Sequence, residues 1–131
     1  MKKTSKALVE EAMAQVTTLT VDQAREMHAK QGVQFVDVRD VRELEHEGVI
    51  PGAYHAPRGM LEFWVDPESP YHKPLFGDDK NYVLFSAAGW RSALAAKTLL
   101  DMGLTNVAHI GGGFNAWRES GGPVESGPKK A

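Results

Sequence analysis

Hydrophobic positions along the chain follow two alternating patterns. Short apolar runs predict buried strands at residues 35–38, 54–56, 82–85 and 107–110. Thr20 with Gln23, and Asp40 with Glu43, have the form of capping boxes at helix starts. Together with apolar residues three and four apart, these signals predict helices at residues 5–16, 21–30, 41–46, 92–100 and 114–120. Because strands alternate with helices, we expect an α/β fold, with a parallel sheet flanked by helices on both faces.

The segment at residues 57–80 interrupts this alternation. It contains four of the seven prolines, but also Phe63, Trp64, Tyr71 and Phe76. That is too many aromatic side chains for a disordered linker, so we expect an ordered loop with a helical turn near residues 59–64.

A chain of 131 residues has room for one ordinary domain. We expect an N-terminal helical extension at residues 1–17, a single domain at 18–122 and a flexible C-terminal tail at 123–131. Glu10 and Glu11 interrupt the stretch where the apolar part of a secretory signal would follow Met1, so we expect a cytoplasmic protein.

Charge and composition exclude several classes of function. A net charge of -2 offers no basic surface for nucleic acid, and no segment is apolar for long enough to cross a membrane. The chain has no cysteine, which removes disulfides, thiolate metal sites and cysteine nucleophiles. Its five histidines lack metal-ligand spacing, so we predict neither a metal nor another cofactor.

The segment at residues 86–92 is the strongest candidate for chemistry. Small residues and Gly89 join a predicted strand to the start of the best predicted helix, where backbone N–H groups can curl around an anion. Arg91 adds a planar fork of donors. The same residues also fit a plain connection between a strand and a helix, so the local pattern leaves both interpretations open.

Four ordered motifs extend this local evidence. They lie at residues 36–39, 48–53, 89–92 and 111–117, and their order and spacing resemble the landmarks of the rhodanese family over residues 18–122. The resemblance implies a central parallel five-stranded sheet. It also implies a loop of the form Cys-x-x-Gly-x-Arg, whose cysteine accepts a sulfane sulfur as a persulfide. In this chain Ser86 occupies the cysteine position.

Serine lacks the chemistry that this position requires. A persulfide needs a readily ionised sulfur, and a hydroxyl becomes a nucleophile only beside a general base. No histidine lies in the loop, and we interpret His109, at the end of the next strand, as a packing or hydrogen-bonding residue. Four residues separate Ser86 from Arg91, as in the family's sulfurtransferases, whereas similar phosphatases have five.

The predicted site therefore centres on this loop. We assign Ser86, the replaced nucleophile, and Arg91 to the catalytic positions. The predicted anion-binding loop comprises Ser86, Ala87, Ala88, Gly89, Trp90, Arg91 and Ser92. Pocket or structural support is assigned to Asp37, Arg39 and Arg58. Trp90 either lies at the pocket rim or seals the loop against the domain, and Gly111 to Gly113 are interpreted as a tight strand-to-helix turn without a ligand.

Three functions fit these residues. The first is a rhodanese-like domain that is inactive in persulfide transfer and keeps an anion-binding or protein-binding role. The second is a genuine sulfurtransferase in which an engineered change replaced the cysteine, and the third is a phosphatase-like or serine hydrolase activity at Ser86. The expected ligand is a small sulfur-containing or other oxyanion, a protein partner is possible, and the sequence leaves enzymatic activity open.

Overall fold

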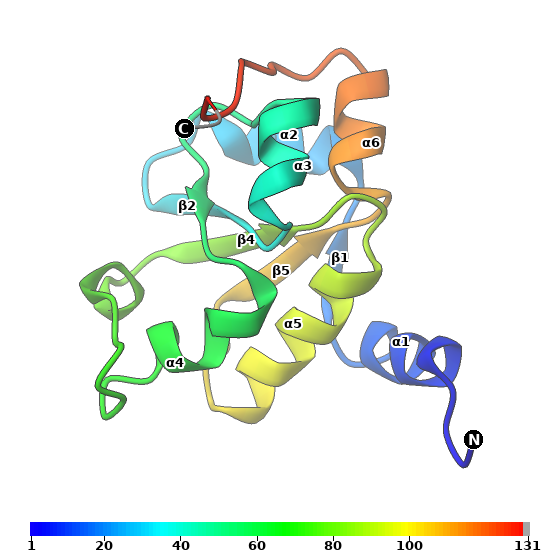
Figure 1. Ribbon diagram of the computed structural model, residues 1–131, viewed down its shortest axis with the longest axis vertical. Helices are drawn as coiled ribbons and strands as arrows, with labels where there is room; N and C mark the ends of the chain where they lie inside the picture. The colour runs from blue at the N-terminus through cyan, green and yellow to red at the C-terminus, as the bar shows by residue number, and fades with distance from the viewer. Residues whose placement is uncertain (130–131) are drawn as a thin grey trace.

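A five-stranded parallel sheet forms the centre of the molecule, and the computed structural model describes residues 1–129 (Figure 1). The strands are β1 (Thr17–Leu19), β2 (Val33–Asp37), β3 (Tyr54–His55), β4 (Asn81–Phe85) and β5 (Val107–Ile110). Their order across the sheet is β1-β5-β4-β2-β3, and every neighbouring pair is parallel. The predicted α/β fold with a five-stranded parallel sheet is confirmed.

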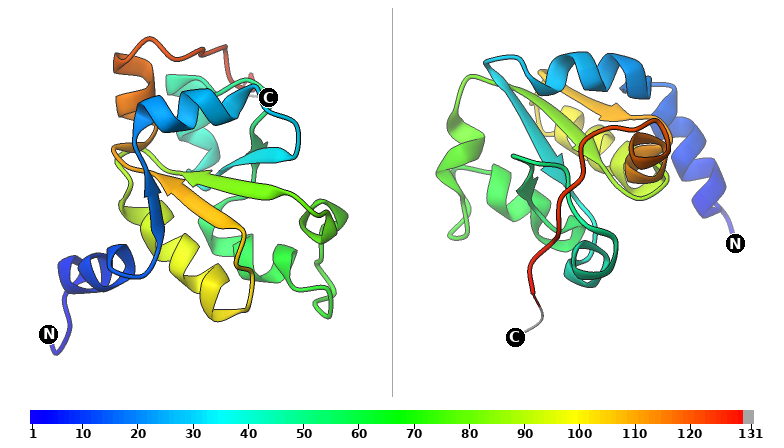
Figure 2. Two further views of the ribbon diagram at one scale, coloured as in Figure 1. Left: turned by 180° about the vertical axis from the view of Figure 1, so that it is seen from behind. Right: turned by 90° about the horizontal axis from the view of Figure 1, so that it is seen from above.

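Helices cover both faces of this sheet, as the views from front and behind show (Figures 1 and 2). They are α1 (Ser5–Met13), α2 (Val21–His28), α3 (Val41–Glu47), α4 (Leu61–Val65), α5 (Trp90–Asp101) and α6 (Gly113–Glu119). One face carries α2, α3 and α6, and the other carries α4 and α5, with α1 packed beside α5. This arrangement leaves the carboxyl ends of the strands free to form a site.

Each face has its own core. One apolar cluster joins Leu84 of the sheet to Leu61 of α4 and Leu99 of α5, all fully buried. The other joins Phe85 to Trp117 of α6, also without exposed surface. Successive residues of β4 thus point to opposite faces, which is why residues 82–85 of this central strand are all hydrophobic and buried.

Local signals set most helix boundaries. The two predicted capping boxes, Thr20 with Gln23 and Asp40 with Glu43, are both present at the starts of α2 and α3. The first helix ends at Met13, short of the predicted residue 16, because the chain then turns toward β1.

Strand β1 was not located by the hydrophobic pattern. It contains only Thr17, Thr18 and Leu19, the two threonines are exposed, and it pairs with a single neighbour at the edge of the sheet. An edge strand with one covered face needs no apolar run, so its signal in the sequence is weak.

The segment at residues 57–80 is ordered, as predicted. It forms a 3-10 turn at Arg58–Met60, helix α4 and a second 3-10 turn at Pro74–Gly77. The Tyr82 hydroxyl donates to the carbonyls of Leu75 and Asp78, at 2.8 and 2.9 Å. These bonds and the buried Phe76 attach the segment to the core.

The C-terminal segment runs along α3 (Figure 2, right). Val49 and Glu125 exchange two backbone hydrogen bonds of 2.9 Å, and Gly127 lies so close to the Leu44 carbonyl that a side chain would not fit. The domain boundaries at 17 and 122, and the flexibility of the tail, stay predictions. No helix within residues 1–129 is long and apolar enough to cross a membrane.

Candidate functional site

The loop at residues 86–92 follows the central strand of the sheet. Ser86 comes directly after β4, at the carboxyl end of that strand, which is where the sequence pattern predicted it. Gly89 has a φ of 100° and immediately precedes α5. A side chain at this φ is strained, and a Cβ on Gly89 would also crowd the Gly112 nitrogen at 3.3 Å. Glycine is therefore required for the turn.

The first two carbonyls of the loop accept hydrogen bonds from the start of α6. Phe114 donates its backbone N–H to the Ser86 carbonyl at 2.8 Å, and Asn115 donates to the Ala87 carbonyl at 3.1 Å. Gly113, with a φ of 59°, lies so close to these carbonyls that it has no space for a side chain. Gly113 thus allows the loop to pack tightly against the start of α6.

The amides of the loop are left without acceptors. Among residues 1–129, no protein group accepts a hydrogen bond from the backbone N–H groups of residues 87–91. These five N–H groups lie at the start of α5, whose dipole places partial positive charge there. Because no group among the described residues accepts from these amides, they remain available to a negatively charged group from outside the protein.

Ser86 is enclosed within the loop that it begins. The residue has no exposed surface, and its Oγ accepts a hydrogen bond of 3.1 Å from the Ser92 backbone N–H. No titratable side chain within the described residues hydrogen-bonds this hydroxyl. The structure therefore provides no general base to activate it.

His109 lies beneath the loop but contacts Ser92 rather than Ser86. Its Nδ1 is 2.9 Å from the Ser92 Oγ, and its Nε2 is 2.9 Å from the Thr18 Oγ1. The ring is fully buried, and this burial lowers its pKa to about 4. A neutral imidazole offers one donor and one acceptor, so His109 links the loop to β1 as a hydrogen-bonding residue.

Arg91 forms an ion pair with Glu43, which is also part of the capping box of α3. Its two terminal nitrogens donate to the Glu43 carboxylate at 2.6 and 3.0 Å. The hydrogen bond from Arg91 holds the pKa of Glu43 below its usual value, and the bond to Glu43 raises the pKa of Arg91. Much of the positive charge expected for an anion is therefore neutralised.

Asp37 and Arg39 form a buried ion pair beside the site. Arg39 donates from Nη2 to Asp37 at 2.8 Å and to the Gly48 carbonyl at 2.8 Å, and its guanidinium lies 4.0 Å from the centre of the Phe114 ring. Both residues are 1% exposed. The pair ties the end of β2 to α3 and α6.

Arg58 lies with α4 and α5 rather than beside the loop. Its guanidinium donates to Glu62 at 2.6 Å and to the Thr98 hydroxyl at 3.2 Å. Neither partner belongs to residues 86–92, so the proposed support role of Arg58 stays a prediction without a direct contact to carry it. Trp90, in contrast, is 71% exposed, which places its side chain at the rim rather than as a seal against the domain.

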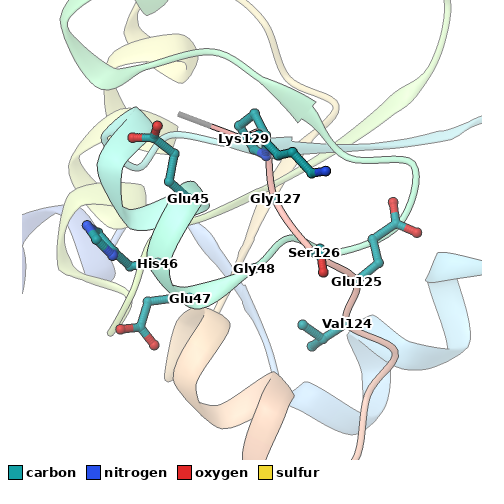
Figure 3. A pocket seen from close by; sticks show the side chains of 10 residues that line it. Glu45, His46, Glu47, Gly48, Val124, Glu125, Ser126, Gly127 and Lys129 are labelled. Atoms are coloured by element: carbon teal, nitrogen blue, oxygen red, sulfur yellow. The ribbon is translucent and has the colours of Figure 1, made fainter. Parts of the chain in front are cut away.

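A hollow of about 690 Å³ lies away from the loop, between α3 and the C-terminal segment (Figure 3). Its side chains include Glu45, Glu47 and Glu125, with Lys129 as the labelled amine. Glu47 accepts a hydrogen bond of 2.6 Å from Arg118. The hollow contains no residue of the loop, and its carboxylates disfavour an anion. Within residues 1–129, no three histidine, aspartate or glutamate side chains lie close enough together to hold a metal ion.

Comparison with protein families extends this description. The family model of the rhodanese-like domain matches residues 20–120. The chain is 30% identical over 108 residues to the thiosulfate sulfurtransferase GlpE of Shewanella oneidensis, covering 82% of this chain and 98% of that one. It is 28% identical over 124 residues to the dual specificity phosphatase Cdc25 of Arabidopsis thaliana, covering 86% and 81%.

Among solved structures, one from Rhodopseudomonas palustris CGA009 is similar over almost the whole chain. It is RPA3614, a protein of unknown function described as a possible tyrosine phosphatase. The TM-score is 0.93 at 53% identity, and the similarity covers 95% of this chain and 96% of that one. The similarity thus extends well outside the residues that the family model matches.

Proposed function

Because this chain belongs to the rhodanese-like domain family and carries Ser86 at the position of the loop cysteine, we propose that it does not transfer persulfide sulfur and that residues 86–92 bind a small oxyanion. The five unpaired amides of residues 87–91 are the observation that carries the binding role. The absence of cysteine carries the lack of transfer.

The transfer step requires a thiolate. A thiolate attacks the sulfane sulfur of a donor, a sulfur–sulfur bond forms on the enzyme, and the rest of the donor leaves with the electron pair. A serine hydroxyl is protonated at neutral pH, and Ser86 has neither a neighbouring base nor exposed surface. The proposed function is therefore binding without formation of a persulfide.

The amides, rather than Arg91, supply most of the proposed binding. Arg91 already donates to Glu43, whereas the five N–H groups have no competing acceptor among the described residues. Hydrogen bonds from several amides and the positive end of a 12-residue helix favour a compact anion such as sulfate, thiosulfate or phosphate.

The relatives also suggest two alternative functions. The thiosulfate sulfurtransferase relatives favour a sulfur-containing anion, and they also fit a genuine sulfurtransferase whose cysteine was replaced. The relative named as a dual specificity phosphatase and the solved structure described as a possible tyrosine phosphatase favour phosphate. Hydrolysis of a phosphate ester still needs a nucleophile, however, and the spacing of four residues between Ser86 and Arg91 differs from the longer phosphatase loop.

An NMR titration tests the proposed binding. Sulfate, thiosulfate or phosphate at millimolar concentration should shift the amide resonances of residues 87–92, with matched chloride as the control for ionic strength. The amide resonances of residues 124–127, in the C-terminal segment, should stay in place. Unmoved loop amides in all three titrations would overturn the anion-binding role.

A further inference from the structure

A groove on the protein surface shares two residues with the loop. This groove of about 610 Å³ lies between α1 and the start of α5, with a predominantly apolar lining. Val9 and Glu10 of α1 line it together with Trp90, Arg91 and Leu94 of α5. Figure 2 shows that α1 lies apart from the sheet and beside this end of α5, so the groove exists only because α1 docks there.

Trp90 gives the groove an aromatic wall. Its side chain is 71% exposed, the largest exposure among the three tryptophans, since Trp64 is half-buried and Trp117 is fully buried. Leu94 lies one helical turn further along α5, on the same side, so the two side chains extend one apolar surface. An exposed tryptophan at the edge of a concave apolar surface is well suited to hold a flat apolar group.

The groove adjoins the loop amides. Trp90 and Arg91 line the groove and also supply two of the five backbone N–H groups without an acceptor. A ligand with its head at the amides would therefore place any attached group against Trp90. Lys6 at the opposite wall is 85% exposed and forms a long salt bridge of 4.0 Å with Glu10, so the charges at that wall balance.

We infer that the groove receives the apolar part of an organic oxyanion whose charged head is held by the loop amides. The inference rests on the proposed anion-binding function and names its ligand class. The ligand is a sulfonate, thiosulfonate or phosphate monoester that carries an aromatic or branched apolar group. A small inorganic anion would fill only the head position.

Calorimetry with paired probes measures the contribution of the groove. Benzenesulfonate and methanesulfonate share the head group but differ in the apolar group. Burial of a ring against Trp90 should make benzenesulfonate bind about tenfold more tightly. Phenyl phosphate against benzenesulfonate then distinguishes a phosphate from a sulfonate head.

Side-chain variants locate this preference. Trp90→Ala should reduce the ratio of the two sulfonate affinities to about twofold or less, because most of the aromatic wall is removed. Leu8→Ser is the matched control, since Leu8 is 42% exposed on α1 but does not line the groove. That variant should keep the tenfold ratio, and circular dichroism should show that both variants remain folded.

The outcomes separate the two levels of the proposal. If sulfate shifts the loop amides but benzenesulfonate binds no more tightly than methanesulfonate, the groove inference is wrong and the anion-binding role stands. If no anion binds, the anion-binding role itself fails. A tenfold preference that survives Trp90→Ala would also overturn the inference, because the ring would then bind elsewhere.

Discussion

Two carboxylate–guanidinium pairs flank the loop, and they differ in almost every physical respect. Asp37 and Arg39 are 1% exposed, share several hydrogen bonds, and have an aromatic ring against the guanidinium. Glu43 and Arg91 are joined as closely, at 2.6 Å, but their side chains are 30% and 41% exposed. Water therefore competes for the second pair and not for the first.

The difference separates a scaffold from an adjustable group. A buried charge that loses its partner has no water to stabilise it, so the Asp37–Arg39 ion pair must stay intact for the protein to remain folded. The half-exposed Glu43–Arg91 pair contributes little to stability and can lose its carboxylate at low cost. We expect substitutions in the first pair to change folding and substitutions in the second to change binding.

The largest effect should come from breaking the buried pair. Arg39→Leu leaves the Asp37 carboxylate buried without a cation and should lower the free energy of unfolding by about 3–5 kcal/mol. Arg42→Leu is the control, because Arg42 is 80% exposed in its pair with Asp40 and should cost less than about 1 kcal/mol. Urea denaturation measures both. Equal losses would show that burial does not distinguish the pairs.

His109 belongs with the scaffold, and its effect should depend on pH. Burial lowers its pKa from 6.5 to about 4, so the unfolded chain binds a proton first as the pH falls. The associated stability is complete above pH 6.5 and declines between pH 6.5 and 4, by at most about 3 kcal/mol.

A variant isolates this contribution from that of the carboxylates. His109→Gln should lower stability at neutral pH and should flatten the decline between pH 6.5 and 4. His46→Gln, at an exposed histidine, should leave the decline unchanged. Parallel slopes for His109→Gln and the parent chain would contradict a neutral buried ring. Chemical denaturation at a series of pH values provides the comparison.

The smallest effect on stability is expected at Glu43. A substitution there should instead strengthen the binding of an anion. Glu43→Gln removes a negative charge beside the loop and frees Arg91, so sulfate should bind about threefold to tenfold more tightly, while stability changes by less than about 1 kcal/mol. Glu47→Gln is the control, because Glu47 pairs with Arg118 away from the loop. Calorimetry would contradict the account if sulfate bound more weakly to Glu43→Gln.

Local sequence signals predicted most of the fold and the position of the site. The capping boxes at Thr20 and Asp40 and the apolar run of β4 act over a few residues, so they can be identified without tertiary contacts. The same holds for Ser86, since a parallel strand places its carboxyl end at the ligand side of the sheet. Strand β1 has no comparable signal because it lies at an edge.

The contacts that set the electrostatics of the site were not predictable in this way. Glu43 and Arg91 are 48 residues apart, and their pairing depends on how α3 packs against the start of α5. The groove beside Trp90 depends on the docking of α1, and the Val49–Glu125 bridge depends on the path of the C-terminal segment. Each requires a tertiary arrangement that periodicity and spacing do not encode.

The most direct measurement is sulfur transfer from thiosulfate to cyanide, followed as thiocyanate, with mass spectrometry for a sulfur adduct on residue 86. The chain with Ser86 should show neither product nor adduct. Ser86→Cys should show both, because serine and cysteine have similar shapes and the loop amides and helix terminus favour a thiolate. Turnover by the serine chain would contradict the central claim. A folded Ser86→Cys chain that takes up no sulfur would show that the missing thiol is not the only obstacle.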